Sequence, residues 1–502
     1  MSCPAKVMVI GLDSADYKLV SEWCDSGDLP VLQSLKEKGV HGRLMSPAGM
    51  GDDATWASFY TAVSPARHGR YFVKAIQHGS YETPFFCDAD LQHEPFWNVL
   101  SRAGRKIAVI DVPKCPSATA LNGIHLTDWH VHGRDHATRS WPPEIAPDLL
   151  ARYGDDRTDR WDADWLCRLD SLSTDEIETL IHRLLESIDH KLSAAETFLA
   201  HGDWDLFLIV FKESHCVGHG CWHLLDKSHP AYSAEQALRF GHPIKRIYQA
   251  IDRAIAKLLE QAGSGCHVIV FSDLGMGPNY TGEHLLDAVL LRLEDSLTWP
   301  LRQRIAMAAE RIKWKVRARP LDEGASVHPH RSRRAFQLEH NEMSGAIRLN
   351  IIGREAEGRI PPGYAVENFC RLLTGELLKL VNSETGHPIV DSVLRTKALF
   401  KGDHVDALPD LFVVWNRHCP IAAAVSPTIG EIRIAPPAYR TGNHLPGGFY
   451  LSCGPGITKA AQLPPASIMD IGPTIAAWLE TSLYNLDGKP ISALCGSPRL
   501  SN

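Results

Sequence analysis

The sequence lacks the features that mark several large classes of protein. No apolar stretch approaches the roughly 20 residues that span a bilayer, and the N-terminus MSCPAKVMVIGLD enters an apolar run without a cleavable leader. The 12 cysteines are scattered without a CxxC pair, in a chain of 502 residues that is too long for a disulfide scaffold. Internal repeats and low-complexity tracts are also absent from the sequence. We therefore expect a cytoplasmic protein with no membrane partner.

An excess of positive charge is missing as well. The chain has 52 Lys and Arg against 59 Asp and Glu, which gives a formal net charge of -7. Proteins that bind nucleic acids generally carry a basic surface, so we expect no nucleic acid polymer as a partner. A small anionic substrate stays compatible with this charge, because a bound metal ion reverses the local field. The oligomeric state is left open, and a homo-oligomer is one of the alternatives.

Apolar runs of strand-forming residues alternate with helical patterns along most of the chain. The apolar runs occupy residues 7–13, 107–113, 206–211, 267–273, 411–415 and 449–457. Helical patterns occupy residues 55–63, 174–201, 240–262 and 469–480. Continuous apolar strands separated by helices are typical of a parallel sheet that is covered on both faces. We therefore expect an α/β fold with a mostly parallel central sheet and helices on both faces.

Residues 284–363 interrupt this alternation. They contain a basic amphipathic helical pattern from Arg302 to Arg319, followed by a polar, turn-rich segment. Basic helical faces are usually exposed to solvent. The functional alternative is that this segment is an inserted cap. We expect residues 1–283 and 364–502 to form one core and residues 284–363 to form an insertion or lid.

Side chains that can bind metal stand where several of these apolar runs end. They are Asp13 in VMVIGLD, Glu213, His215 and His219 in FKESHCVGH, Asp273 in VIVFSDLG, and His444 in YRTGNHLPGG. In an open α/β sheet the carboxyl ends of the strands form the crevice where ligands bind. Carboxylates and imidazoles delivered there by several strands are typical of a metal site.

Each of these residues also has a structural alternative. His215 and His219 are four residues apart and share one helix face, and a pair after a buried strand favours metal binding over a structural role. Asp13 and Asp273 could each cap the helix that follows. Asp52, in GMGDDATW, could likewise be the N-cap of the next helix.

Taken together, these motifs resemble the alkaline phosphatase superfamily, in particular its type I phosphodiesterase and nucleotide pyrophosphatase branch. The matching pieces follow the family's order: IGLD, LPVLQSLKEKGV, TWASFYTAVSPARHG, the Glu-x-His-x-x-x-His stretch, SDLGMG, GNHLPGGFYLSCGPGI, DIGPTIAAWL and LDGKPI. The resemblance implies an alkaline-phosphatase-like catalytic core and two neighbouring metal ions, commonly zinc. It places one ion on His215, His219 and His444, and the second on Asp13, Asp52 and Asp273.

Three departures from the family pattern concern this site. His215 stands where the family has an Asp, and Leu274 stands where it has the His of SDHG. Alignment on TWASFYTAVSPARHG places the family's nucleophilic Thr or Ser near Asp52. Asp52 and Thr55 are therefore the candidate catalytic residues, and His284 is a candidate replacement for the ligand that is missing at Leu274.

Other residues have open roles. Arg348 and Arg440 could bind an anionic substrate group by paired hydrogen bonds, although ordinary structural contacts are an equal alternative. The histidines of DWHVHGRDH, namely His130, His132 and His136, could bind a metal or an anion, and a solvated loop is the simpler explanation.

The first hypothesis is a metal-dependent hydrolase that acts on a phosphate ester, phosphodiester or nucleotide-like, with a metal-activated nucleophile. Its cofactor would be one or two divalent metal ions, with zinc expected first and iron or manganese as alternatives. The second hypothesis is a metalloenzyme on the same fold with iron or manganese and redox or lyase chemistry. The third is a non-catalytic binding protein on a degenerate site, since a fold does not fix a function.

Overall fold

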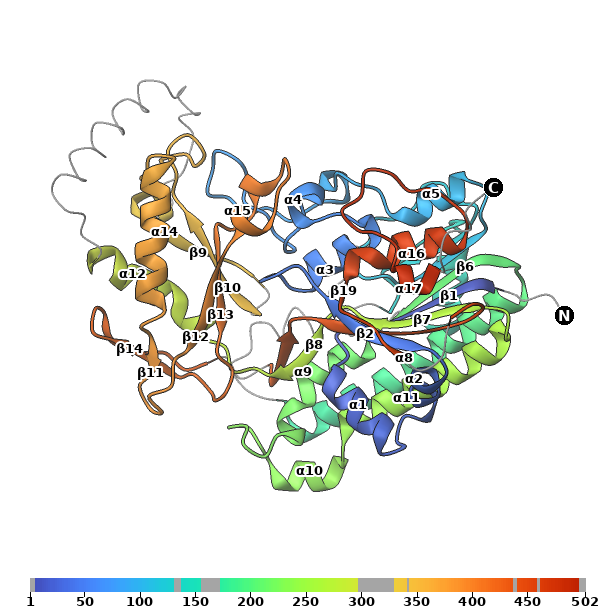
Figure 1. Ribbon diagram of the computed structural model, residues 1–502. Coiled ribbons are helices and arrows are strands. Elements are labelled where there is room, and N and C mark those ends of the chain that lie inside the picture. The colour runs from blue at the N-terminus through green and yellow to red at the C-terminus, as the bar shows by residue number, and fades with distance from the viewer. Residues whose placement is uncertain are drawn as a thin grey trace.

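The computed structural model shows two parts side by side, with the larger part on the right of Figure 1. It describes residues 5–130, 137–154, 172–296, 329–340, 343–436, 440–457 and 461–495. The larger part, the large lobe, is built around one long twisted sheet, and the smaller part contains antiparallel sheets. The basic helix expected at residues 302–319 and the histidines His132 and His136 lie outside the described residues.

The central sheet has ten strands among the described residues, in the order β18-β2-β17-β7-β1-β6-β3-β4-β5, with β19 beside β2. The strands are β1 (Ala5–Leu12), β2 (Val40–Met45), β3 (Ile107–Ile110), β4 (Gly123–Thr127), β5 (Arg139–Trp141), β6 (Trp204–Phe211), β7 (His267–Ser272), β17 (Gly448–Cys453), β18 (Ala461–Gln462) and β19 (Ala466–Ser467). The inner strands β7, β1, β6, β3 and β4 run parallel, whereas β17 and β5 pair antiparallel. The mostly parallel sheet expected from the sequence is confirmed.

The first strand illustrates why the inner strands are continuously apolar. Val7 and Val9 belong to the hydrophobic cluster on one face of the sheet, and Met8, Ile10 and Leu12 belong to the cluster on the other. Successive side chains of a strand point to opposite faces. Since helices cover both faces, every position of the strand is buried and no polar alternation appears.

Helices cover both faces of this sheet. One face carries α1 (Tyr17–Asp25), α2 (Pro30–Lys38), α8 (Thr174–Ala200), α9 (Glu213–Leu225) and α11 (Pro243–Ala262). The other carries α3 (Asp52–Thr61), α5 (Phe96–Arg102), α16 (Ile471–Trp478) and α17 (Ser492–Cys495). The longest helix, α8, starts at a capping box in which Ser173 and Glu176 each accept the other's backbone N–H.

The smaller part, which we call the small lobe, comprises the described residues from 283 to 433. It contains α12 (Glu283–Ser296), β9 (Ala335–Leu338), β10 (Ser344–Leu349), α14 (Tyr364–Leu377), β11 (Val381–Asn382), β12 (Val390–Arg395), α15 (Thr396–Leu399), β13 (Leu411–Trp415), β14 (Ala423–Ser426) and β15 (Gly430–Arg433). Its antiparallel sheets have the orders β12-β13-β10-β9 and β11-β14-β15.

The small lobe continues beyond residue 363, where the sequence placed the end of the insertion. Leu285, Ile347, Phe369, Leu411 and Ile432 belong to one hydrophobic cluster, which spans both sides of that boundary. The apolar run at 411–415 therefore forms a strand of the small lobe, not of the central sheet. We propose a division of the chain near residue 433 in place of residue 363.

The remaining elements are short. They are α4 (Pro65–His68), η1 (Asp88–Asp90), α6 (Ile145–Tyr153), α10 (Ala234–Phe240), β8 (Gly275–Pro278), η2 (Pro329–Ser332), η3 (Val405–Ala407), β16 (Gly442–Leu445) and η4 (Ile468–Asp470). Among the helices that the structure describes, none combines the length and the apolar character that crossing a membrane requires.

A buried group of charges ties four elements of the large lobe together. Lys191 of α8 donates to the carbonyl oxygen of Val210 in β6 at 2.8 Å. Its Nζ also lies 3.5 Å from Glu213 at the start of α9 and 3.7 Å from Asp111 after β3. The side chains of all three charged residues are 0% exposed. Low-dielectric surroundings make such a group costly to break, so it fixes where α9 begins.

Replacing Lys191 by Met leaves two buried carboxylates without their cation. We expect the free energy of unfolding in urea to fall by about 3–5 kcal/mol. Lys6→Met is the matched control, because Lys6 forms an ion pair with Asp205 at 2.7 Å but its side chain is 66% exposed. That control should lose about 1 kcal/mol at most. Equal losses in the two variants would contradict this account of the buried charges.

Candidate metal centre

The candidate site lies where three neighbouring parallel strands end. β1 pairs with β6 on one side and β7 on the other, and the strands are followed by Asp13, Glu213 and Asp273 respectively. Hydrogen bonds hold these ends together: the N–H of Asp13 donates to the carbonyl oxygen of Phe211 at 2.9 Å. The N–H of Ser14 donates to Asp273 Oδ1 at 2.8 Å. Parallel pairing thus brings together residues that are far apart in the sequence.

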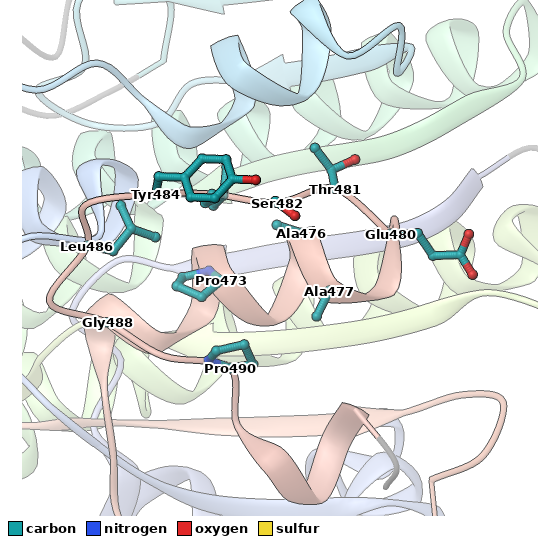
Figure 2. A pocket seen from close by; sticks show the side chains of 11 residues that line it. Pro473, Ala476, Ala477, Glu480, Thr481, Ser482, Tyr484, Leu486, Gly488 and Pro490 are labelled. Carbon is teal, nitrogen blue, oxygen red and sulfur yellow. The ribbon is translucent and has the colours of Figure 1, made fainter. Parts of the chain in front are cut away.

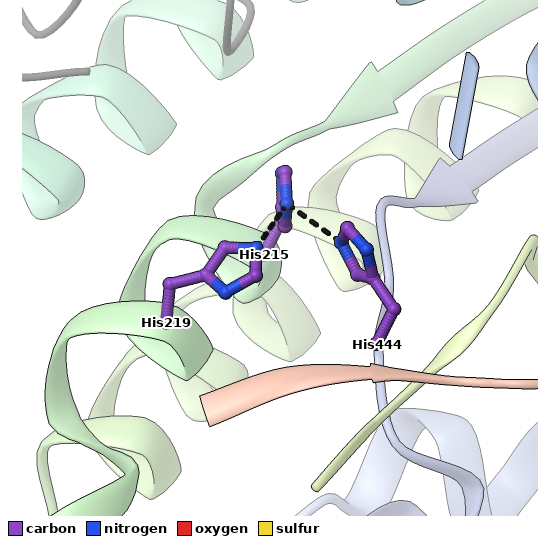
Figure 3. A group of neighbouring side chains, drawn as sticks. All are labelled: His215, His219 and His444. Atoms are coloured by element: carbon purple, nitrogen blue, oxygen red, sulfur yellow. Dashed lines mark hydrogen bonds between the residues drawn. The ribbon is translucent and has the colours of Figure 1, made fainter. Parts of the chain in front are cut away.

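Three buried histidines face one another beside these strand ends. His215 and His219 lie one turn apart on α9, and His444 lies on β16, which pairs with β8 directly after β7. His215 Nε2 is 2.7 Å from His219 Nε2 and 2.9 Å from His444 Nε2. The three rings converge on one point in Figure 3, and their ligand nitrogens lie within 4.8 Å of one another. The structure therefore assembles the three histidines that the sequence analysis named.

Contacts of the outer ring nitrogens decide which atoms face the centre. His219 Nδ1 lies 2.7 Å from the carbonyl oxygen of Gly442, which can only accept, so Nδ1 carries the proton. His215 Nδ1 lies 3.3 Å from Asp13 Oδ2, which favours the same tautomer. In neutral rings both Nε2 atoms then present lone pairs to each other. A cation between them removes this repulsion, and outer carbonyl or carboxylate partners are usual for histidines that bind metal.

Two glycines allow α9 to approach β16 and β8 closely. A Cβ atom on Gly442 would lie 2.3 Å from the carbonyl oxygen of Gly218 and 2.9 Å from Trp222 Cβ. A Cβ atom on Gly218 would lie 2.8 Å from Met276 Cγ. The hydrogen bond from His219 to Gly442 therefore depends on the absence of a side chain at Gly442, and the packing of α9 against β8 depends on the absence of one at Gly218.

Three buried carboxylates accompany the imidazoles. Asp13, Asp52 and Asp273 are 1%, 7% and 0% exposed. Asp13 Oδ1 accepts hydrogen bonds from Ser14 Oγ at 3.2 Å and from Trp56 Nε1 at 3.3 Å. Burial raises the pKa of Asp273 well above its usual value, and the negative charges of Asp13 and Asp52 raise it further. This part of the site therefore carries a negative potential.

Asp273 shows how the residues present fit a metal ion. Its Oδ1 accepts the N–H of Ser14, whereas its Oδ2 is buried and has no hydrogen-bond partner among the residues that the structure describes. A buried carboxylate oxygen without a partner costs free energy. A divalent cation would coordinate this oxygen and offset the neighbouring charges. Neutral imidazole nitrogens beside carboxylate oxygens are a donor set that suits divalent metals.

The two candidate catalytic residues lie in the first turn of α3. Asp52 is the first residue of the helix, where exposed backbone N–H groups favour a negative charge. Thr55 is fully buried, and its Oγ1 donates to the carbonyl oxygen of Gly51 at 2.7 Å, so its hydroxyl is engaged within the helix. Asp53 forms a buried ion pair with Arg70 at 2.8 Å.

A nearby hydroxyl and imidazole form a structural pair. Ser58 Oγ lies 3.0 Å from His68 Nε2. His68 Nδ1 accepts the backbone N–H of Arg70 at 3.1 Å, so the proton of the neutral ring sits on Nε2 and points to Ser58. Burial lowers the pKa of His68 to about 3. The imidazole therefore cannot take the proton of Ser58 in this arrangement, and Ser58 is not activated as a nucleophile.

The two arginines expected to bind substrate are held in different ways. Arg348 is buried in the small lobe, where its Nε donates to Glu355 Oε1 at 2.7 Å and its Nη1 to the carbonyl oxygen of Leu408 at 2.7 Å. These contacts favour the structural alternative for Arg348, because its guanidinium donates to acceptors within the small lobe. Arg440 lies next to β16, and its carbonyl oxygen accepts from Asn279 Nδ2 at 3.0 Å. A substrate contact of Arg440 stays a prediction.

His284, the candidate replacement for the ligand missing at Leu274, makes its contacts within α12 and the segments beside it. Leu274 is fully buried directly after Asp273. His284 belongs to α12 of the small lobe, where its ring interacts with the backbone of Ile421 and Ile434 and burial lowers its pKa to about 4. These surroundings are those of a neutral histidine in the small lobe, and a ligand role of His284 stays a prediction.

The sequence analysis missed three residues that contact the site. Trp56 Nε1 donates to Asp13, Asn443 Oδ1 accepts the N–H of His444 at 2.7 Å, and Arg417 Nη1 donates to the carbonyl oxygen of His444 at 2.5 Å. Trp56 lies in TWASF and Asn443 precedes His444, so both stood within motifs already recognised. Arg417 lies 27 residues before His444, and no local pattern indicates its contact.

A separate hollow of about 520 Å³ lies between α16 and the loop that follows it. Its lining includes Pro473, Glu480, Tyr484 and Pro490, shown in Figure 2. None of the candidate metal ligands lines it, and Glu480 is its one ionisable group apart from the phenol of Tyr484. The convergent polar groups that mark a catalytic site are therefore at the histidines and not in this hollow.

Imidazoles and carboxylates at the carboxyl ends of parallel strands form a site in the place where α/β enzymes bind their ligands. A family model described as "Type I phosphodiesterase / nucleotide pyrophosphatase" matches residues 7–419. The chain belongs to this family, within the alkaline phosphatase superfamily, and is an enzyme of the class that hydrolyses phosphate esters.

Solved structures show the same fold. Murine ectonucleotide pyrophosphatase/phosphodiesterase 5 is 12% identical with a TM-score of 0.51, and the match covers 96% of this chain and 97% of that one. Phosphonoacetate hydrolase from Sinorhizobium meliloti 1021, in complex with phosphonoformate, is 14% identical with a TM-score of 0.50 and 95% coverage of both chains. No curated protein sequence matches this chain.

The close contact between α9 and β16 gives a first test of the site. In Gly442→Ala the added methyl group would meet the carbonyl oxygen of Gly218, so β16 must move away from His219. We expect zinc affinity, measured by competition with a chromophoric chelator, to fall roughly 10–100-fold. Gly375→Ala in α14 is the control, since its Cβ would meet nothing within 4 Å. That variant should keep its zinc affinity. An unchanged zinc affinity in Gly442→Ala would contradict a role of this close contact in holding the metal ligands.

The raised pKa of Asp273 gives a second test, with a defined sign. Ionisation is penalised in the folded state, so the penalty is absent below the unfolded pKa near 3.9 and grows as the pH rises towards the raised value. In protein treated with a chelator, Asp273→Asn should therefore raise the free energy of unfolding, and more at about pH 8 than at about pH 5. The Asn Oδ1 can still accept from Ser14. Urea unfolding at both pH values measures the effect, and a pH-independent difference would contradict it.

Proposed function

We propose that this enzyme hydrolyses a small phosphate ester with divalent metal ions held at the candidate metal centre. The observation that carries the proposal is the convergence of three buried imidazoles, with ligand nitrogens within 4.8 Å of one another. The buried Oδ2 of Asp273, which has no hydrogen-bond partner among the described residues, supports the same conclusion. Membership in the phosphodiesterase family supplies the reaction class.

The proposed centre has two kinds of donor. One ion would be held by the imidazoles of His215, His219 and His444, and a second by the carboxylates of Asp13, Asp52 and Asp273. Imidazole nitrogens suit zinc, whereas a set of carboxylate oxygens suits a harder ion such as magnesium or manganese. We therefore propose zinc at the imidazoles and a harder divalent ion at the carboxylates. Iron or manganese at the imidazoles is the alternative.

Divalent ions in such a site lower the pKa of a water or hydroxyl group and offset the charge that develops on the phosphoryl oxygens. The chain's own contribution is to hold the donors in place. The carbonyl oxygen of Gly442 fixes the tautomer of His219, and Asp13 favours the matching tautomer of His215. Asp52 lies near the position where the family has an esterifiable hydroxyl, and Thr55 keeps its hydrogen bond to the helix. We therefore propose direct hydrolysis without an ester of a chain hydroxyl.

A small anion is the proposed substrate class. An inactive variant of the murine relative was solved in complex with AMP, and the Sinorhizobium enzyme with phosphonoformate. In this chain the proposed ligands are at most 7% exposed, so a substrate must present its phosphoryl group on a slender part of the molecule. A nucleotide-like phosphodiester or a phosphomonoester satisfies this requirement.

Elemental analysis of protein purified without chelators tests the proposal directly, together with turnover of bis(p-nitrophenyl) phosphate and p-nitrophenyl phosphate. We expect zinc in stoichiometric amount, and loss of turnover after dialysis against a chelator with recovery when zinc and magnesium are restored. Protein without bound metal that still hydrolyses either ester would overturn the proposed function.

His219→Ala removes the ligand whose orientation is best determined. We expect zinc affinity and phosphodiester turnover to fall by more than the roughly 10–100-fold that the loss of an outer-shell partner costs. His201→Ala is the control, because His201 is exposed at the end of α8 and contacts its own helix. Retention of metal and activity in His219→Ala would rule out the imidazole site.

A second candidate function rests on the donor set itself. Three imidazoles, with Leu274 at a position where the family has another histidine, also suit iron or manganese with redox or lyase chemistry. Stoichiometric iron or manganese in the purified protein, with no turnover of either ester, would favour that alternative. Zinc with ester turnover would exclude it.

A further inference from the structure

The small lobe contacts the backbone of the metal centre at His444. Arg417, two residues after β13, donates from Nη1 to the carbonyl oxygen of His444 at 2.5 Å and from Nη2 to the carbonyl oxygen of Met343 at 2.6 Å. Met343 immediately precedes β10. One guanidinium therefore connects the end of β10, a central strand of the small-lobe sheet, to the strand that carries a proposed metal ligand. Both carbonyls accept from its planar fork, which a single-point cation cannot reproduce.

Side chains hold the peptide groups on both sides of His444. Its carbonyl oxygen accepts from Arg417, and its N–H donates to Asn443 Oδ1 at 2.7 Å. Asn443 Nδ2 in turn donates to Asn279 Oδ1 at 3.1 Å. Two side chains thus hold the backbone of His444 in addition to the pairing of β16 with β8, and Arg417 is the one that belongs to the small lobe.

The small lobe also holds the segment that leads to Asp52. The carbonyl oxygen of Gly49 accepts from Ser344 Oγ at 2.6 Å and from His340 Nε2 at 3.0 Å. Gly49 has a φ of +77°, and a Cβ atom there would lie 2.7 Å from the ring of Phe412. Burial lowers the pKa of His340 to about 4, so the ring is neutral near pH 7 and uses its one N–H for this bond.

An apolar contact between the lobes supports these hydrogen bonds. Met50 and Ala54 of the large lobe belong to the same hydrophobic cluster as Phe336, Leu338 and Phe412 of the small-lobe sheet. The two lobes are therefore packed together next to the start of α3. A lid that opens freely would break this cluster and both sets of hydrogen bonds.

We propose that the small lobe is a brace for the metal centre, in which Arg417 positions His444 while His340 and Ser344 position Asp52. The inference rests on the proposed function, because it concerns the same two groups of ligands. Catalytic and metal-binding groups must be held within about 0.5 Å of their working geometry. Mutation of the outer-shell partners that achieve this typically lowers metal affinity roughly 10–100-fold. None of the three residues is a proposed ligand, so each is a positioning residue.

Zinc titration of the full chain tests the role of Arg417. Arg417→Met should weaken zinc binding roughly 10–100-fold and change the visible absorption of the cobalt-substituted protein, because His444 loses its fixed direction. Arg417→Lys should recover part of the affinity, since an ammonium can donate to one of the two carbonyls. Arg433→Met is the matched control: Arg433 lies on β15 of the same lobe and pairs with Glu384 and Glu431. It should match the wild type in affinity and spectrum.

The second arm measures manganese binding by the loss of the free-ion signal in electron paramagnetic resonance. His340→Phe keeps an aromatic ring among its neighbours and removes the donor to Gly49, and Ser344→Ala removes the other donor with less risk to folding. Both should weaken manganese binding roughly 10–100-fold and leave the cobalt spectrum unchanged. Wild-type affinity for both ions in the Arg417, His340 and Ser344 variants would overturn the brace alone. A wild-type chain that binds neither ion would overturn the proposed function and the brace together.

Discussion

The burial of imidazole and carboxylate groups next to one another is the constraint on which the rest of this structure depends. Each of these groups would be better solvated in water, and several present lone pairs or like charges to one another. The fold must therefore hold these groups together against their own repulsion. The electrostatic cost of this arrangement is clearest at Asp273, because burial and the charges of Asp13 and Asp52 all raise its pKa.

Support for the site comes from three directions. Beneath α9, Lys191 links Glu213 and Asp111 and fixes where the helix begins. Between α9 and β16, the missing side chain of Gly442 allows a contact so close that its carbonyl oxygen sets the tautomer of His219. From the other side, the small lobe holds the backbone of His444 through Arg417. A site whose free energy is unfavourable by itself is thus stabilised by interactions made elsewhere, as expected where function and stability conflict.

The sequence predicted the large lobe better than the small one. Runs such as residues 206–211 and 267–273 are buried on both faces, so their composition identifies inner strands directly. The run at 411–415 has the same composition but lies in an antiparallel sheet of the small lobe, because apolar character does not specify which strands pair. The sequence left Arg348 open between a substrate contact and a structural one for a similar reason: it shows the guanidinium but not the Glu355 carboxylate that accepts from it.

What the sequence determined by itself was the chemistry of the donors and the order of the elements that carry them. The spacing of His215 and His219 already places both on one helix face, and the ends of the apolar runs already place Asp13 and Asp273 at strand termini. Tertiary structure alone decided that His444 Nε2 lies 2.9 Å from His215 Nε2, that the carbonyl oxygen of Gly442 accepts from His219, and that Arg417 reaches the site from another lobe. The physical reason is that these contacts depend on distances between segments far apart in the chain, and such distances are set by packing and not by local sequence.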